Sequence, residues 1–135
     1  MASKNDLNVL VVDDEKRLTD MIVETFKTFP VFKSVLPSYD GADAIRKISN
    51  QKFDIIILDL GMPKKGGLEV LDFIEKEEES HQCRDASILI ISGGFTADNV
   101  SEAKNHTKYF LAKPFKINDL KLKIGEILKA EKVAS

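Results

Sequence analysis

The chain has 135 residues, of which 43% are hydrophobic and 31% are charged, so it has enough apolar material for the core of one domain and too much for a disordered segment. Its 20 Lys and Arg against 22 Asp and Glu give a net charge of -2, which disfavours direct binding to DNA or anionic lipid. The single cysteine, Cys83, excludes an intramolecular disulfide. The first residues carry no signal-peptide pattern, and no apolar run approaches the ~20 residues of a membrane span. We therefore expect a protein of the reducing cytoplasm that does not contact a membrane.

Short aliphatic runs recur along the chain and predict the strands of a sheet. Residues 9–12, 55–58 and 88–91 form the strongest runs, and residues 31–36 and 109–112 form weaker ones. Apolarity is continuous within the strong runs rather than alternating. That pattern is typical of strands covered on both faces, as in a parallel sheet.

Helical spacing of apolar residues separates these runs. Three stripes stand out, formed by Leu18, Met21, Ile22, Thr25, Phe26 and Phe29, by Leu68, Leu71 and Ile74, and by Leu120, Ile124, Ile127 and Leu128. Residues 97–106 form the weakest predicted helix, because only Val100 and Ala103 are available to bury. Strand and helix alternate five times, which predicts a doubly wound α/β domain with crossover helices on both faces. We expect this domain to cover residues 5–132, with no output domain.

Polar residues follow the strands at the edge where ligands of such sheets bind. Asp13, Asp14 and Glu15 follow the first run, and Asp59 follows the third. Adjacent acids after a strand are also ordinary helix caps, worth about 0.3–1 kcal/mol against the helix dipole. If the first and third strands are neighbours, however, Asp13 or Asp14 lies close to Asp59. Two carboxylates ~4 Å apart repel by about 4 kcal/mol at an effective dielectric of 20, so the cluster requires a cation or raised pKa values. Mg²⁺, which prefers oxygen ligands, would meet this requirement for a cation.

Four strand ends together resemble the receiver domain of the response regulators of two-component signalling. The matching residues are 11–15 (VVDDE), 58–63 (LDLGMP) with Gly67 following, 91–93 (ISG) and 113–115 (KPF). Each motif is weak alone, but the set is specific because all four occur in order and at the expected separations. The resemblance implies a flavodoxin-like sheet of five parallel strands in the order 2-1-3-4-5 with five helices, as in the chemotaxis regulators.

The resemblance also implies a role for each residue at these strand ends. Asp59 would be the phosphoacceptor, and Lys113 and Ser92 would bind phosphoryl oxygens. Phosphoryl transfer depends mainly on positioning and charge neutralisation, which a metal and a lysine would supply from opposite sides. The peptide bond between Lys113 and Pro114 would be cis and would aim the lysine inward.

The metal ligands implied by the resemblance are the carboxylates of Asp13, Asp14 and Asp59 and the backbone carbonyl of Gly61, with Asp13 acting directly or through water. The implied cofactor is Mg²⁺. Gly61, Gly66 and Gly94 leave the mouth of the site without side chains, so we expect no local water-positioning group to shorten the lifetime of the phosphate.

A conformational switch is implied as well, formed by Ser92 and Phe110. Phosphorylation would draw Ser92 toward the phosphate, and Phe110 would turn into the space that it leaves. The adjacent Tyr109 should face the opposite side of the sheet. We expect the phosphorylated form to favour a second arrangement of the surface around residues 97–110.

The expected function is that of a single-domain response regulator, a phosphoprotein that is not an enzyme beyond its own phosphorylation and slow dephosphorylation. It would accept phosphate from a histidine kinase or a histidine phosphotransfer protein and then bind a downstream protein. The alternatives are a phosphorelay shuttle and a receiver-like interaction module that is not phosphorylated.

A haloacid-dehalogenase phosphatase is disfavoured because it needs a second acid where this chain has Gly61. His81 and Cys83 are too few for a zinc site, and we interpret both as plain surface.

Overall fold

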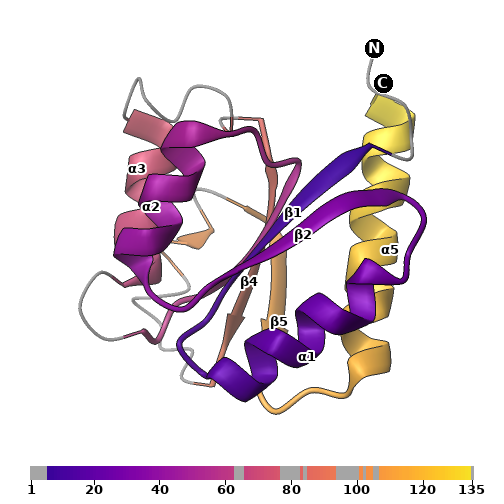
Figure 1. Cartoon of the computed structure of the whole chain (residues 1–135), viewed down its shortest axis with the longest axis horizontal. Helices are drawn as coiled ribbons and strands as arrows, with labels where there is room; N and C mark the ends of the chain where they lie inside the picture. The colour runs from indigo at the N-terminus through magenta and orange to yellow at the C-terminus, as the bar shows by residue number, and fades with distance from the viewer. Residues whose placement is uncertain are drawn as a thin grey trace.

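The fold is a parallel sheet with helices on both faces (Figure 1), and the computed structural model describes residues 6–62, 66–76, 83, 85–93, 101, 103–104 and 107–134, the side chains of 131–134 excepted. Five strands form the sheet in the order β2-β1-β3-β4-β5, and all four strand pairs are parallel. The strands are β1 (Leu7–Val12), β2 (Phe32–Ser38), β3 (Ile55–Asp59), β4 (Ser87–Ser92) and β5 (Tyr109–Ala112). The predicted flavodoxin-like sheet and its strand order are therefore confirmed.

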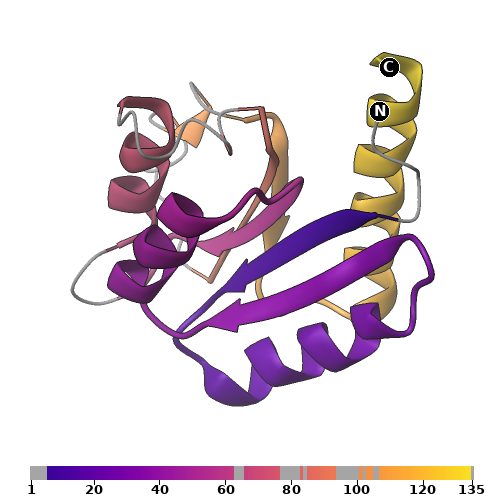
Figure 2. The same cartoon turned by 45° about the horizontal axis from the view of Figure 1, so that its top comes forward.

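Helices α1 and α5 cover one face of the sheet, and α2 and α3 cover the other (Figures 1 and 2). The described residues contain four helices rather than the five expected: α1 (Lys16–Lys27), α2 (Gly41–Asn50), α3 (Gly67–Lys76) and α5 (Ile117–Ala134). The remaining predicted helix, at 97–106, falls largely outside the described residues. Within it, Ser101 and Ala103 are helical. None of the helices in the described part of the chain is long and apolar enough to span a bilayer.

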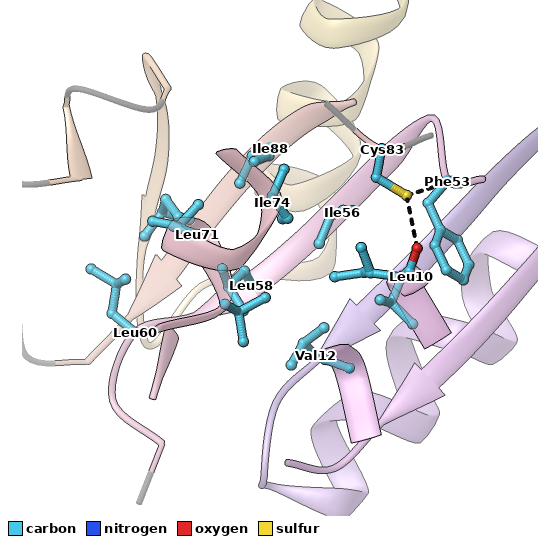
Figure 3. Packing of buried hydrophobic residues seen from close by; sticks show 14 of the residues in the cluster. Leu10, Val12, Phe53, Ile56, Leu58, Leu60, Leu71, Ile74, Cys83 and Ile88 are labelled. Atoms are coloured by element: carbon cyan, nitrogen blue, oxygen red, sulfur yellow. Dashed lines mark hydrogen bonds between the residues drawn. The ribbon is translucent and has the colours of Figure 1, made fainter. Parts of the chain in front are cut away.

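Each face of the sheet has its own hydrophobic core, because successive strand residues point to opposite sides. The core under α1 and α5 is formed by Val9, Val11, Ile22, Val23, Phe26, Phe32, Val35, Ile55, Ile57, Leu89, Ile91, Leu120, Ile124 and Ile127. The core under α2 and α3, part of which Figure 3 shows, includes Leu10, Val12, Ile48, Ile56, Leu58, Val70, Leu71, Ile74, Ile88 and Ile90. The central strands are buried on both faces, which explains their continuous apolar sequence.

Helix α2 is tied to the edge strand β2 by Asp43. The N-cap carboxylate of Asp40 accepts a hydrogen bond from the backbone N–H of Asp43 at 2.7 Å. The Asp43 carboxylate accepts a hydrogen bond from the Ser38 hydroxyl at 2.8 Å and pairs with Lys47 at 2.9 Å and with Arg46. This network fixes the carboxyl end of β2 against the start of the helix.

Cys83 is not a surface residue, so our interpretation of it was wrong. Its side chain is fully buried in the core under α2 and α3 (Figure 3), and its sulfur accepts a hydrogen bond from the backbone N–H of Phe53 at 3.3 Å. The thiol also lies 3.4 Å from the carbonyl oxygen of Gln51. A polar local sequence concealed this burial, because the contacts come from a segment 30 residues away. His81 lies outside the described residues.

Candidate functional site

An acidic cluster lies at the carboxyl edge of the sheet, where β1 and β3 are neighbours. Val12 pairs with Leu58 in the parallel register, so Asp13 and Asp59, which follow them, meet at the same edge. Carboxylate oxygens of Asp13, Asp14 and Asp59 lie within 4.8 Å of one another. Asp13 and Asp59 are buried and Asp14 is exposed. The prediction that these acids come together is confirmed.

The backbone around Asp13 is held rigidly at the start of α1. Its N–H donates to the carbonyl of Ser38 at 3.1 Å, and its carbonyl accepts a hydrogen bond from the Thr19 hydroxyl at 2.8 Å. One carboxylate oxygen, Oδ1, accepts a hydrogen bond from the backbone N–H of Glu15 at 3.0 Å. The buried Thr19 of α1 thus anchors the backbone of Asp13, and the Glu15 N–H orients its carboxylate.

Asp59 ends β3 and is oriented by the loop that follows. Its Oδ1 accepts a hydrogen bond from the backbone N–H of Gly61 at 3.0 Å. A Cβ on Gly67 would lie 2.5 Å from the Asp59 carbonyl oxygen and 2.8 Å from the Cα of Leu60. The start of α3 therefore packs directly on the backbone that carries Asp59, and only glycine permits this approach.

Lys113 enters the same cluster from the end of β5. Its peptide bond to Pro114 is cis, as predicted, and its backbone N–H donates to the carbonyl of Ser92 at 2.8 Å. The ammonium nitrogen lies 2.8 Å from Asp13 Oδ2 and 3.4 Å from Asp59 Oδ2. Burial on its own lowers the pKa of Lys113, but the contacts with Asp13 and the charge of Asp59 outweigh it, so the pKa lies above its ordinary value.

In Asp13, by contrast, burial outweighs the contacts that favour the charged form. Burial is the largest influence and raises the pKa of Asp13, with the charge of Asp59 acting in the same direction; the contacts with Lys113 and the Glu15 N–H oppose it only in part. Its Oδ2 is the buried side-chain oxygen, among the residues described, that accepts no hydrogen bond, although the charge of Lys113 lies 2.8 Å away. A buried oxygen with free lone pairs, in a group of three carboxylates, fits a hard cation such as Mg²⁺.

Ser92 and Gly61 border the cluster at neighbouring strand ends. Ser92 ends β4, is 2% exposed, and pairs with Ala112 of β5 in the register. Gly61 is exposed, and a Cβ there would lie 3.6 Å from Asp59 Oδ1, an ordinary contact. Gly66 is described, whereas Gly94 lies outside the described residues.

Phe110 and Tyr109 face opposite sides of the sheet, as predicted. Phe110 is half-buried against the core under α2 and α3, the core that also contains Ala103. Tyr109 packs against the core under α1 and α5. Phe110 therefore lies on the same side of the sheet as Ala103, which belongs to the segment whose arrangement we expect phosphorylation to change.

Glu15 joins the site in a way that the sequence did not reveal. Its Oε1 lies 3.2 Å from Lys113 Nζ, across a separation of 98 residues. The only signal was its place beside Asp13 and Asp14, and that signal equally describes a helix cap.

The chain belongs to the response regulator receiver domain family, whose model matches residues 9–125. Response regulator ArlR of Staphylococcus aureus is 30% identical over 123 residues, which are 91% of this chain and 53% of ArlR. This chain thus spans about half the length of the curated relatives it matches. Proteins of this family are phosphoacceptor signalling domains of two-component systems rather than classical enzymes, and they typically bind Mg²⁺ at acidic residues.

Solved structures show the same fold. The signal receiver domain of a putative Luxo repressor protein from Vibrio parahaemolyticus is 29% identical with a TM-score of 0.79, over 95% of this chain and 94% of that one. A chain of the CheX-CheY-BeF3-Mg+2 complex from Borrelia burgdorferi is 25% identical with a TM-score of 0.76, over 90% of this chain and 88% of that one.

Proposed function

We propose that this chain is a cytoplasmic response regulator receiver that accepts a phosphoryl group on Asp59 from the phosphohistidine of a histidine kinase or histidine phosphotransfer protein. The observation that carries the proposal is the arrangement around Asp59. Its carboxylate lies beside two further acids and 3.4 Å from the ammonium of Lys113. A nucleophilic carboxylate next to both an acidic cation site and a lysine suits phosphoryl transfer, which depends on charge neutralisation.

In the transfer, a carboxylate oxygen of Asp59 forms a bond to phosphorus while the bond from phosphorus to the donor nitrogen breaks. The electron pair of the broken bond stays with the imidazole nitrogen of the donor. The product at Asp59 is an acyl phosphate. The hydrogen bond from Gly61 to Oδ1 holds the carboxylate in a fixed orientation for this step.

Magnesium would be held by Asp13, Asp14 and Asp59 with the Gly61 carbonyl, and it would supply positive charge to the phosphoryl oxygens. The buried, unbonded oxygen of Asp13 supports this assignment. The presence of Mg²⁺ with BeF3 in the matched Borrelia complex is further support. The cation would also relieve the repulsion among the three carboxylates.

Lys113 and Ser92 would bind phosphoryl oxygens from the remaining directions. Lys113 is 13% exposed, and its ammonium already lies 3.4 Å from the Asp59 carboxylate to which the phosphoryl group would be attached. Ser92 ends the strand adjacent to β3 in the sheet, which places its hydroxyl at the same edge as Asp59.

The output of the site would be a shift in the surface formed by residues 97–110, followed by binding to a downstream protein. Phe110 packs half-buried against the core that contains Ala103, and it lies on β5, which pairs with the strand that Ser92 ends, so we expect a movement of Ser92 to change the space available to its ring. Hydrogen exchange with and without beryllofluoride tests this. Amides of residues 97–110 should change their protection, and unchanged exchange there would rule out the switch.

Incubation with acetyl phosphate and Mg²⁺, followed by intact-mass measurement, tests the phosphorylation itself. The wild type should gain the mass of one phosphoryl group in an acid-stable, base-labile form, and Asp59→Asn should not. Omission of Mg²⁺ should abolish the adduct. If the wild type stays unlabelled, the chain is an interaction module. If a labelled chain readily returns its phosphate to a phosphotransfer protein, it is a relay shuttle.

A further inference from the structure

Glu15 is placed to cap helix α1 but does not do so. It is the N-cap residue of this helix, in an extended conformation, and its side chain makes no capping hydrogen bond. A carboxylate at this end of a helix can interact favourably with the free N–H groups of the first turn and with the helix dipole. Instead, the carboxylate of Glu15 turns to Lys113, with Oε1 3.2 Å from Nζ. The contact with the lysine has replaced the cap.

Glu15 completes a ring of three carboxylates around one ammonium. Lys113 Nζ lies 2.8 Å from Asp13, 3.2 Å from Glu15 and 3.4 Å from Asp59. The ammonium donates hydrogen bonds to Glu15 and Asp59 and forms an ion pair with Asp13, so carboxylates surround its three N–H donors before any phosphate arrives. Phosphoryl oxygens that bind Lys113 must therefore displace or share one of these partners.

Of the three carboxylates around Lys113, Glu15 is the one that an incoming phosphodonor meets. Its side chain is 61% exposed, whereas those of Asp13 and Asp59 are 0% and 6% exposed. Glu15 and Lys113 together line an open cavity of about 510 Å³ beside the acidic cluster. The remaining lining residues are Leu18, Gly93, Pro114 and Phe115.

We propose that Glu15 is a positioning residue that competes with phosphoryl oxygens for Lys113 and so weakens the binding of anionic phosphodonors. The inference rests on the proposed phosphorylation of Asp59. Glu15 acts through Lys113 and through its own charge, and it makes no bond to the transferred group. Loss of the Glu15 carboxylate should free one N–H of Lys113 and remove a negative charge from the cavity that these two residues line.

The test compares two small donors of different charge with the Glu15→Gln variant. At pH 7 acetyl phosphate is mainly a dianion and phosphoramidate mainly a monoanion. A unit charge at roughly 6 Å in water changes binding by about threefold per unit of donor charge. Phosphorylation by phosphoramidate should therefore become about threefold faster and that by acetyl phosphate about tenfold faster. The gain should appear in the donor concentration needed for half-maximal rate, and the maximal rate should change little.

Glu24→Gln is the matched control, because it removes the same charge from an exposed position on the same helix. It should change the two rates equally and by less than twofold. A second readout uses the metal-free, unphosphorylated protein. The side-chain ammonium NMR signal of Lys113, assigned by its loss in Lys113→Met, should shift in Glu15→Gln and stay in place in Glu24→Gln.

The outcomes separate this inference from the function on which it rests. Equal or slower rates in Glu15→Gln with both donors, while the wild type is labelled, would overturn the role of Glu15 and leave the phosphoacceptor assignment intact. A wild type that takes no phosphate would overturn the assignment itself. An unshifted Lys113 signal in Glu15→Gln would overturn the contact whatever the labelling shows.

Discussion

Asp13 and Lys113 form the closest charged contact in the site, with Oδ2 of the aspartate 2.8 Å from Nζ of the lysine. The same ammonium also contacts Asp59 and Glu15. One positive charge thus serves three carboxylates, and Asp13 is the most deeply buried of them. The contact is close, yet it leaves the cluster with an excess of negative charge that a bound cation would relieve.

Asp13→Asn should therefore stabilise the protein in buffer without divalent cations. The substitution removes a buried charge whose pKa is raised mainly by burial, and Lys113 keeps its other two carboxylates. We expect the free energy of unfolding in urea to rise by about 1–2 kcal/mol. Added Mg²⁺ should stabilise the wild type by mass action and the variant hardly at all.

Asp85→Asn provides the control for this experiment, because Asp85 is exposed and precedes β4 at the opposite edge of the sheet. Its free energy of unfolding should change by less than about 0.5 kcal/mol, with the response to Mg²⁺ unaltered. A less stable Asp13→Asn would show that the ion pair with Lys113 outweighs the repulsion in the cluster.

Gly67→Ala should damage the site through the backbone. The new Cβ would lie 2.5 Å from the Asp59 carbonyl oxygen, so α3 or the end of β3 must shift. We expect the free energy of unfolding to fall by about 2–3 kcal/mol, together with slower labelling of Asp59 by acetyl phosphate. Gly125→Ala, in the exposed part of α5 with nothing within 4 Å of its Cβ, should instead stabilise by up to about 1 kcal/mol and leave labelling unchanged. Similar effects from the two substitutions would contradict the close approach at Gly67.

Much of the architecture could be predicted because the decisive signals are local. Strands β1, β3 and β4 are buried on both faces, and their continuous aliphatic runs follow directly from that burial. Asp13 and Lys113 lie directly after a strand, and Asp59 is the last residue of β3. Parallel strands in a known order then bring these residues to one edge of the sheet.

The failures have a common cause, which is contact between distant segments. Cys83 is buried through contacts with Phe53, 30 residues earlier, and its polar neighbours in sequence concealed this. Glu15 reaches Lys113 across 98 residues, and its position after β1 is equally typical of a helix cap. Side-chain direction depended in both cases on tertiary packing, which a pattern of residue types does not encode.

The burial of Cys83 predicts an unreactive thiol. Burial raises the pKa of this cysteine, so both access and thiolate formation are suppressed in the folded protein. A disulfide reagent should label it only as fast as the protein opens, with the rate rising through the urea transition. Labelling of the native protein as fast as of the unfolded chain would contradict the burial.

Cys83→Ala should lower the free energy of unfolding by about 1–3 kcal/mol, because it leaves a small cavity and removes the sulfur that accepts the Phe53 N–H. Cys83→Ser should be less harmful than the alanine variant if the hydrogen bonds matter, since a hydroxyl can still accept from Phe53 and donate to Gln51. If alanine is tolerated as well as serine, packing alone explains the site.

Asp43 should make the stability of the fold depend on acid pH. Burial on its own raises the pKa of Asp43, but the contacts with Lys47, Arg46 and Ser38 outweigh it and lower the pKa from 3.8 to about 2. Because the folded protein binds this proton less tightly than the unfolded chain, the stabilisation is complete above pH 3.8 and is lost as the pH falls through 2.

Asp43→Asn should accordingly lower the free energy of unfolding by about 1–2 kcal/mol at pH 7, after allowance for solvent screening of a partly exposed carboxylate. The difference from the wild type should shrink steadily between pH 4 and pH 2 in urea titrations, because protonation removes the same charge from the wild type. Glu126→Gln, which breaks an exposed ion pair 3.7 Å long on α5, should change stability by less than about 0.5 kcal/mol at every pH. A constant difference between wild type and Asp43→Asn across this range would show that hydrogen-bond geometry, and not the charge of Asp43, ties α2 to β2.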